Sequence, residues 1–131
     1  MTVNKPWGSY TDYYRTDKVV FKLIYINPKS QLSLQSHESR QEMWFVVEGE
    51  CSCYLEEIHT SGQTGITSMS LKEGDYIFIP RDSKHRLSNR SEVICTVAEM
   101  QFGTCSEDDI VRYADKYGRR TVDCRDPRHD R

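Results

Sequence analysis

The sequence predicts an all-β protein, a sandwich or small barrel of short strands with one short helix near its C-terminus. Short runs rich in β-branched and aromatic residues recur along the chain, and glycine, proline or asparagine separates most of them. Hardly any helical period lies between these runs. The 131 residues fit one compact domain. We expect this domain to cover residues 1–119, followed by a charged tail over residues 120–131.

The predicted strands follow one another closely along the chain. Residues 18–26 (KVVFKLIYI) are apolar and stop just before a proline. Residues 42–49 (EMWFVVEG) and residues 50–58 (ECSCYLEEI) are adjacent, so the junction at Gly49 is predicted to be a tight turn. The other predicted strands are residues 31–37, 67–71, 76–80, 84–89 and 92–101.

One segment, SEDDIVRYADKYG, has helical features instead. Ser106 is a suitable N-cap, and the three acidic residues after it would lie in the first turn, where the helix dipole favours negative charge. Apolar residues then recur at helical spacing from Ile110, and Gly118 suits the C-terminal stop. The pattern predicts one short helix over residues 107–117.

Composition excludes several classes of partner. The formal net charge of −2 and the lack of a dominant basic face argue against nucleic acid and anionic membranes. No apolar run reaches the ~18 residues of a membrane span, and the first residues lack the apolar stretch of a secretory signal. We therefore expect a cytoplasmic protein.

Five cysteines occur in the chain. An odd number without a secretory signal indicates free thiols in a reducing compartment. Cys51 and Cys53 are two residues apart on a predicted strand, so they point to the same face. We expect both to pack in the core, because the alternative, a soft-metal pair, lacks a second cysteine pair at suitable spacing.

Four polar residues fall on or beside predicted strands in a pattern that suits a metal. Gln35 and His37 share one face of a strand, Glu42 starts the next strand after a short turn, and His85 lies far downstream. A barrel interior can bring them together as two imidazoles, a carboxylate and an amide oxygen. This ligand set suits one divalent ion, with zinc as the first choice and manganese, cobalt, nickel or iron as alternatives.

The spacing of these residues resembles the two-part cupin signature, which implies a small β-barrel or jelly roll. Six residues separate Glu42 from a glycine, five separate Gly74 from Pro80, and three separate His85 from Asn89. Three positions depart from the signature: Gln35 replaces the first histidine, Asp82 replaces a glycine, and Lys29 replaces the glycine that often opens the first part.

One cupin subfamily explains why Gln35 stands in place of the first histidine. The stretches KPWGSY, LSLQ with His37, Arg40-x-Glu42-x-Trp44, KHRLSN and EDDIVRYADKYGR resemble the C-terminal domain of type II phosphomannose isomerases. In many bacteria this domain is fused to a mannose-1-phosphate guanylyltransferase, and its first metal ligand is itself glutamine. The resemblance covers residues 4–119. The chain departs from the subfamily around the metal at Ser36, Glu38, Ser39 and Met43.

The resemblance implies metal-dependent interconversion of mannose 6-phosphate and fructose 6-phosphate, for the supply of GDP-mannose and polysaccharide precursors. The substrate is a dianion, so cationic groups are expected near the metal. Arg40 and Arg86 flank metal ligands, and Arg112 lies in the last matching stretch. We predict that these arginines bind substrate; the alternative for each is an ordinary solvated charge.

The reaction also needs a group that moves a proton between two carbons. The candidates are Glu42, Lys84 and Lys22. The alternation of the predicted strand places Lys22 on the same face as Val20 and Ile24. A carboxylate that ligates a metal is a poor proton carrier, which weakens the case for Glu42. His59 and His129 fall in an expected loop and in the charged tail, and we assign neither to the site.

Two other functions fit the same residues. The chain could be a non-catalytic sugar-phosphate-binding or regulatory cupin module, or an isomerase or epimerase of another sugar. These 131 residues contain no glycine-rich nucleotidyltransferase loop, so a separate guanylyltransferase is an expected partner. A homodimer is expected by analogy with other small cupins.

Overall fold

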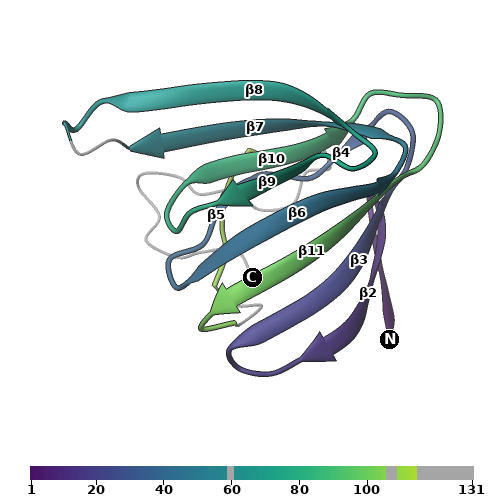
Figure 1. Ribbon diagram of the computed structural model, residues 1–131, viewed down its shortest axis with the longest axis horizontal. Coiled ribbons are helices and arrows are strands. Elements are labelled where there is room, and N and C mark those ends of the chain that lie inside the picture. The colour runs from purple at the N-terminus through teal and green to yellow at the C-terminus, as the bar shows by residue number, and fades with distance from the viewer. Residues whose placement is uncertain (59–60, 106–108, 115–131) are drawn as a thin grey trace.

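The structure is a computed structural model that describes residues 1–58, 61–105 and 109–114. Two antiparallel sheets make up the fold (Figure 1). The first sheet has the spatial order β1 (Thr2–Lys5), β2 (Gly8–Arg15), β3 (Val19–Ile26), β11 (Cys95–Gly103), β6 (Arg40–Glu48) and β9 (Tyr76–Ile79). The second has the order β12 (Val111–Ala114), β5 (Leu34–Ser36), β10 (Lys84–Asn89), β7 (Glu50–Ile58) and β8 (Thr64–Lys72), and β4 (Ser30–Gln31) also pairs with β10.

The predicted all-β class is confirmed, and the described residues contain no helix. Strict alternation organises the strands: on β3, every second residue from Val20 to Ile26 is buried. Apolar side chains of both sheets, among them Trp44 from β6 and Leu87 from β10, form one core cluster. The two sheets therefore pack face to face with a shared interior.

Each predicted strand corresponds to an observed one, but β1 and β2 were not predicted. Their sequences, TVNK and GSYTDYYR, contain few aliphatic residues and show no apolar alternation. They are in the sheet because β2 pairs along almost the whole length of β3 and β1 pairs with β2. Pairing with a neighbouring strand, rather than local pattern, determines their conformation.

The predicted helix is wrong where the structure describes it. Val111–Ala114 forms strand β12 and pairs with β5, while residues 107–108 and 115–117 lie outside the described residues. The carboxylate of Asp109 accepts hydrogen bonds from the backbone N–H groups of Glu38 (3.0 Å) and Ser39 (2.9 Å). These tertiary contacts and the ladder with β5 outweigh local helix propensity, which is a weak preference. The predicted tail over residues 120–131 also lies outside the described residues.

The predicted turn at Gly49 is confirmed. Gly49 joins β6 to β7 with φ at +82°, and a Cβ there would lie 2.9 Å from the carbonyl oxygen of Ile94. Only glycine avoids both the strained backbone and this contact.

The predicted cysteine packing is also confirmed. Cys51 and Cys53 are buried in the core, and both are free thiols, as are Cys95 and Cys105. Cys124 lies outside the described residues. Nowhere in the described chain is there a helix long and apolar enough to cross a membrane.

Asn89 holds the end of β10 in place. Its Nδ2 donates to the carbonyl oxygens of Ile26 (2.9 Å) and Val93 (2.7 Å), and its Oδ1 accepts from the backbone N–H (2.9 Å) and the hydroxyl (2.7 Å) of Ser91. The side chain is almost fully buried. Asn89 thereby links the second sheet to the end of β3 in the first.

Substitution of Asn89 tests this link. We expect Asn89→Ala to lower the free energy of unfolding by about 2–4 kcal/mol, because it removes several hydrogen bonds, among them a buried one to the carbonyl oxygen of Ile26. Urea denaturation measures the change. Ser68→Ala, at an exposed position on β8, serves as the control and should change stability by less than about 0.5 kcal/mol. Equal effects of the two substitutions would contradict the role of Asn89.

Candidate metal centre and its cavity

The candidate site lies between the two sheets, where their registers bring polar residues to the inner faces. In the second sheet, Arg112, Gln35 and His85 are direct neighbours across β12, β5 and β10. Glu42 lies near the start of β6 in the first sheet, and His37 follows the end of β5 in the second. Segments far apart in the sequence therefore supply one site.

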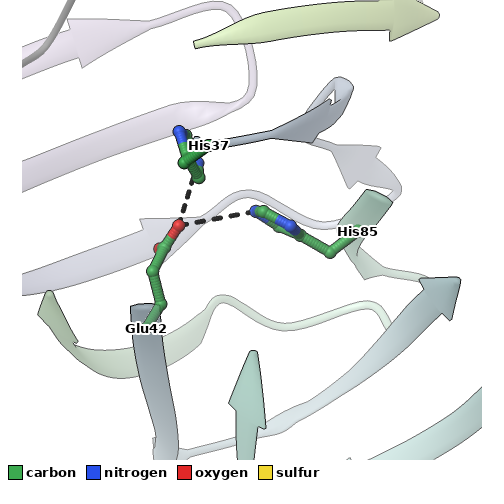
Figure 2. A group of neighbouring side chains, drawn as sticks. All are labelled: His37, Glu42 and His85. Atoms are coloured by element: carbon green, nitrogen blue, oxygen red, sulfur yellow. Dashed lines mark ion pairs between the residues drawn. The ribbon is translucent and has the colours of Figure 1, made fainter. Parts of the chain in front are cut away.

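His37, Glu42 and His85 form a compact buried cluster (Figure 2). Their potential ligand atoms all lie within 4.8 Å of one another. Glu42 Oε1 lies 2.9 Å from His37 Nε2 and 3.5 Å from His85 Nε2. Both rings thus present the same nitrogen to one carboxylate oxygen.

Backbone carbonyl groups orient both imidazoles. His37 Nδ1 lies 2.5 Å from the carbonyl oxygen of Asp109, and His85 Nδ1 lies 2.9 Å from that of Ser83. A carbonyl oxygen can only accept, so Nδ1 carries the proton in each ring, and Nε2 of the neutral ring holds a lone pair. Metal-ligating histidines are commonly fixed in this way by a hydrogen bond from their other nitrogen.

The protonation states agree with this picture. Burial lowers the pKa of His37 below its usual value, and the charge of Glu42 offsets this only in part. Burial raises the pKa of Glu42, but the interactions of its carboxylate with His37 and His85 outweigh burial and hold the pKa well below its usual range. The cluster therefore combines an ionised carboxylate with a neutral His37 ring at neutral pH.

The donor set fits a divalent ion. Glu42 Oε1 is buried and accepts no hydrogen bond from the residues that the structure describes. Two imidazole nitrogens and one carboxylate oxygen are ligands that zinc, manganese, iron, cobalt and nickel accept. Gln35 donates from its amide nitrogen to the hydroxyl of Ser33 at 3.2 Å, so its amide oxygen is the atom that would serve as a fourth ligand.

Arg40 offers a second explanation for the buried carboxylate. Its Nη2 lies 3.1 Å from His37 Nε2, and its Nε lies 3.7 Å from Glu42 Oε1. A guanidinium only donates, so this contact again requires a lone pair on His37 Nε2. A network of Arg40, His37 and Glu42 can compensate the charge without an ion. Metal content distinguishes the two arrangements.

A cavity of about 90 Å³ opens beside the cluster. Glu42, His85 and Gln35 line it, and its other charged lining residues are Lys5, Lys22, Arg40, Glu99 and Arg112. Lys22, Arg40 and Arg112 are buried. Buried cationic groups around one small cavity suit an anionic ligand.

Lys84 and Arg86 are not brought into this cavity. On β10, the inward residues are His85 and Leu87, so their neighbours Lys84 and Arg86 point to the opposite face. Lys84 Nζ lies 4.4 Å from the centre of the Tyr113 ring. Arg86 was chosen from the sequence because it flanks His85, and Lys84 was chosen as a candidate for proton transfer. Both adjoin His85, and in a strand adjacent residues point to opposite faces.

Glu99 is a site residue that the sequence reasoning missed. It is buried, lines the cavity, and accepts hydrogen bonds from Trp44 Nε1 (3.0 Å) and Gln101 Nε2 (2.5 Å). Burial raises its pKa to about 7, and the charge of Glu42 adds to this rise while Lys22 opposes it.

Alternation along the strand could have identified these residues. Glu99 and Gln101 share the inward face of β11 with Cys95 and Val97. Two polar residues on the core face of a predicted strand are the same pattern that identified Gln35.

The family follows from the comparison with known proteins. Residues 1–115 match the family model of the mannose-6-phosphate isomerase C-terminal domain. The chain belongs to this family. The resemblance to that domain, predicted from the sequence motifs, is thereby confirmed.

The curated relatives that the chain matches are much longer than these 131 residues. The chain is 36% identical over 120 residues to the alginate biosynthesis protein AlgA of Pseudomonas fluorescens and 34% identical over 118 residues to the mannose-1-phosphate guanylyltransferase of Escherichia coli K12. These matches cover 91% and 89% of this chain but 23% of each relative. The chain thus spans less than a quarter of the length of these relatives.

Solved structures agree on the fold. The capsular polysaccharide assembling protein CapF from Staphylococcus aureus superposes with a TM-score of 0.74 at 15% identity, over 88% of this chain and 32% of CapF. The Schizosaccharomyces pombe Cnp3 cupin domain superposes with a TM-score of 0.63 at 6% identity, over 72% of this chain and 64% of that domain. The predicted cupin fold is confirmed.

Removal of either imidazole tests the metal centre. We expect the wild-type chain to retain about one equivalent of divalent metal, and His37→Ala or His85→Ala to weaken binding by at least roughly 100-fold, because each removes a ligand. Elemental analysis after dialysis measures metal content, and circular dichroism checks the β fold. His129→Ala, in the predicted tail, is the matched control. A double variant that keeps stoichiometric metal would contradict the site, and a metal-free wild type would support the Arg40 network.

The pKa of Glu99 predicts a pH dependence of stability. Its folded-state pKa of about 7 exceeds the ordinary value of 4.5, so the folded state holds the proton longer. The stabilisation is complete below pH 4.5 and is lost as pH rises through about 7. In metal-free protein, the difference in unfolding free energy between wild type and Glu99→Gln should fall by about 3 kcal/mol across this window.

Urea denaturation at several pH values measures that difference. Glu50→Gln, at an exposed position on β7, is the control. The difference in unfolding free energy between wild type and this variant should not change with pH. A Glu99→Gln profile parallel to that of wild type would show that Glu99 titrates normally in the fold.

Proposed function

We propose that this chain is a metal-dependent aldose–ketose isomerase that interconverts mannose 6-phosphate and fructose 6-phosphate. One observation carries the proposal: the His37–Glu42–His85 cluster adjoins a cavity lined by buried cations, in a chain of the mannose-6-phosphate isomerase C-terminal family. The activity would supply precursors of GDP-mannose and polysaccharides, in keeping with the names of AlgA and the guanylyltransferase relatives.

The cations of the cavity are suited to the phosphate. Arg112 lies directly opposite Gln35 in the β12–β5 pairing, which places it beside a proposed metal ligand. Arg40 contacts the cluster itself. A phosphate dianion accepts charge-assisted hydrogen bonds from guanidinium groups, often two at once. We therefore assign phosphate binding to Arg40 and Arg112, and not to the outward-pointing Arg86.

A divalent ion held by Gln35, His37, Glu42 and His85 would supply a Lewis acid for the two substrate oxygens next to the transferred proton. The chain itself must bind the phosphate, exclude water and move that proton. Of the proton-transfer candidates, Lys22 and Glu42 line the cavity and Lys84 does not. Lys22 is our first choice, since Glu42 would be committed to the ion.

A second function is supported by the contacts of Arg40. Because Arg40 can neutralise the buried carboxylate without an ion, the same cavity could bind a sugar phosphate without catalysis, as a binding or regulatory module. An isomerase or epimerase of another sugar would use the same groups. In each case we infer a cytoplasmic protein that works together with a guanylyltransferase.

A coupled assay with mannose 6-phosphate tests the proposal. We expect turnover that a chelator removes and added metal restores. Arg112→Ala should lower kcat/KM by about 30- to 1000-fold, or about 2–4 kcal/mol of transition-state binding, because it removes a charge-assisted contact. Arg86→Ala is the matched control: it removes the same side chain from the outer face of β10 and should change kcat/KM by less than about threefold.

Solvent exchange of the C2 proton separates the alternatives. Metal-loaded protein that binds mannose 6-phosphate without exchanging this proton would be a binding module. Protein that neither binds nor exchanges would overturn the substrate assignment. A larger loss in Arg86→Ala than in Arg112→Ala would overturn the assignment of the phosphate site.

A further inference from the structure

The side chain of Gln101 carries a buried hydrogen-bond acceptor that the fold leaves unused. Gln101 lies on β11, lines the cavity beside the metal cluster and is only 1% exposed. Its amide oxygen, Oε1, is buried and accepts no hydrogen bond from the residues that the structure describes. A buried acceptor without a donor costs free energy, so such an atom in a cavity indicates that a ligand supplies the donor.

Neighbouring side chains fix the orientation of this amide. Gln101 Nε2 donates to Glu99 Oε1 at 2.5 Å, and Trp44 Nε1 donates to Glu99 Oε2 at 3.0 Å. An indole N–H and an amide nitrogen can only donate, so both oxygens of Glu99 act as acceptors. Gln101 therefore turns its nitrogen toward Glu99, and its oxygen points away from that carboxylate. The Trp44 ring in turn meets the His85 ring edge to face, with centroids 5.5 Å apart.

The unused oxygen belongs to a residue beside the proposed metal ligands. Gln101 lies directly opposite Glu42 in the pairing of β11 with β6, which are adjacent strands in Figure 1. Both residues are buried and line the cavity. Directly opposite residues of an antiparallel pair have Cβ atoms about 4.5–5.5 Å apart. A ligand bound to an ion at Glu42 would therefore lie within reach of the Gln101 side chain.

We propose that Gln101 Oε1 accepts a hydrogen bond from the C3 hydroxyl of the sugar phosphate, and that this contact selects the sugars that the cavity accepts. The inference rests on the proposed function, in which the ion binds the substrate oxygens on C1 and C2. The C3 hydroxyl is the next group along the sugar from that end. A sugar without this hydroxyl leaves the buried oxygen unpaired, and sites of this kind reject such analogues.

The other polar parts of the substrate suit this oxygen less well. An amide oxygen only accepts, and the oxygens of a phosphate dianion accept too, so the two would repel each other. The phosphate is matched instead by the guanidinium groups of Arg40 and Arg112. The ion is the remaining alternative, because an amide oxygen can ligate a metal. Metal content of a Gln101 variant separates that alternative from the proposal.

Calorimetric binding of sugar phosphates to the full chain, with zinc added, tests the proposal without relying on turnover. The wild type should bind 3-deoxymannose 6-phosphate roughly 10- to 100-fold more weakly than mannose 6-phosphate, because the buried oxygen loses its donor. The 3-deoxy-3-fluoro analogue should be weakened by a similar factor, since fluorine cannot donate. These measurements use the wild type alone and do not depend on the folding of any variant.

Gln101→Met removes the amide with little change in size. In this variant the ratio between the two affinities should fall to less than about threefold, while the corresponding ratio for the 4-deoxy analogue should stay at its wild-type value. Gln63→Met, at an exposed position before β8, is the matched control and should keep both wild-type ratios. Circular dichroism checks the β fold, and elemental analysis should show the same metal content as in wild type.

The outcomes separate this inference from the proposed function. A wild type that binds the 3-deoxy analogue as tightly as mannose 6-phosphate would overturn the role of Gln101, whether or not it turns the substrate over. Loss of metal in Gln101→Met would overturn it as well, by making the oxygen a metal ligand. A wild type that discriminates at C3 through Gln101 but does not exchange the C2 proton would support the inference and overturn the isomerase. Protein that binds no sugar phosphate would overturn both.

Discussion

The buried carboxylate of Glu42 is the constraint on which the interior of this protein depends. A charge removed from water must be compensated by neighbouring groups. Here the compensation comes from His37 after β5, from His85 on β10 and from Arg40 one inward position earlier on β6. These groups belong to both sheets, so the packing of the sheets and the arrangement of the cluster depend on each other. A one-residue slip of β6 or β10 would turn Glu42 or His85 to the outside.

Alternation gives the first sheet two faces with different roles. The inner residues of β11 pass from Val97 to the polar Glu99 and Gln101, so the core changes into the wall of a cavity along one strand. The outer residues of β11 and β6, such as Met100 and Phe45, remain apolar. Polar groups inside and apolar groups outside reverse the usual order of a soluble protein, and such reversals are expected where a site or an interface is present.

Much of the fold and part of the candidate site could be predicted from the sequence. The all-β class, the strands between residues 18 and 103 and the turn at Gly49 follow from local composition and turn residues. The spacing of His37, Glu42 and His85 selected three residues that the structure brings within 4.8 Å. These features were predictable because alternation and turn preference act between near neighbours in the chain.

Other features were decided only by the tertiary structure. Residues 111–114 have a helical pattern but form β12, because β5 offers backbone hydrogen bonds that local propensity cannot match. Lys84 and Arg86 flank His85 in sequence but face away from it. The raised pKa of Glu99 arises from burial beside Glu42, which lies on another strand. Sequence by itself determined which residue types were available, whereas which of them meet in the cavity depended on pairing between strands that are distant in the chain.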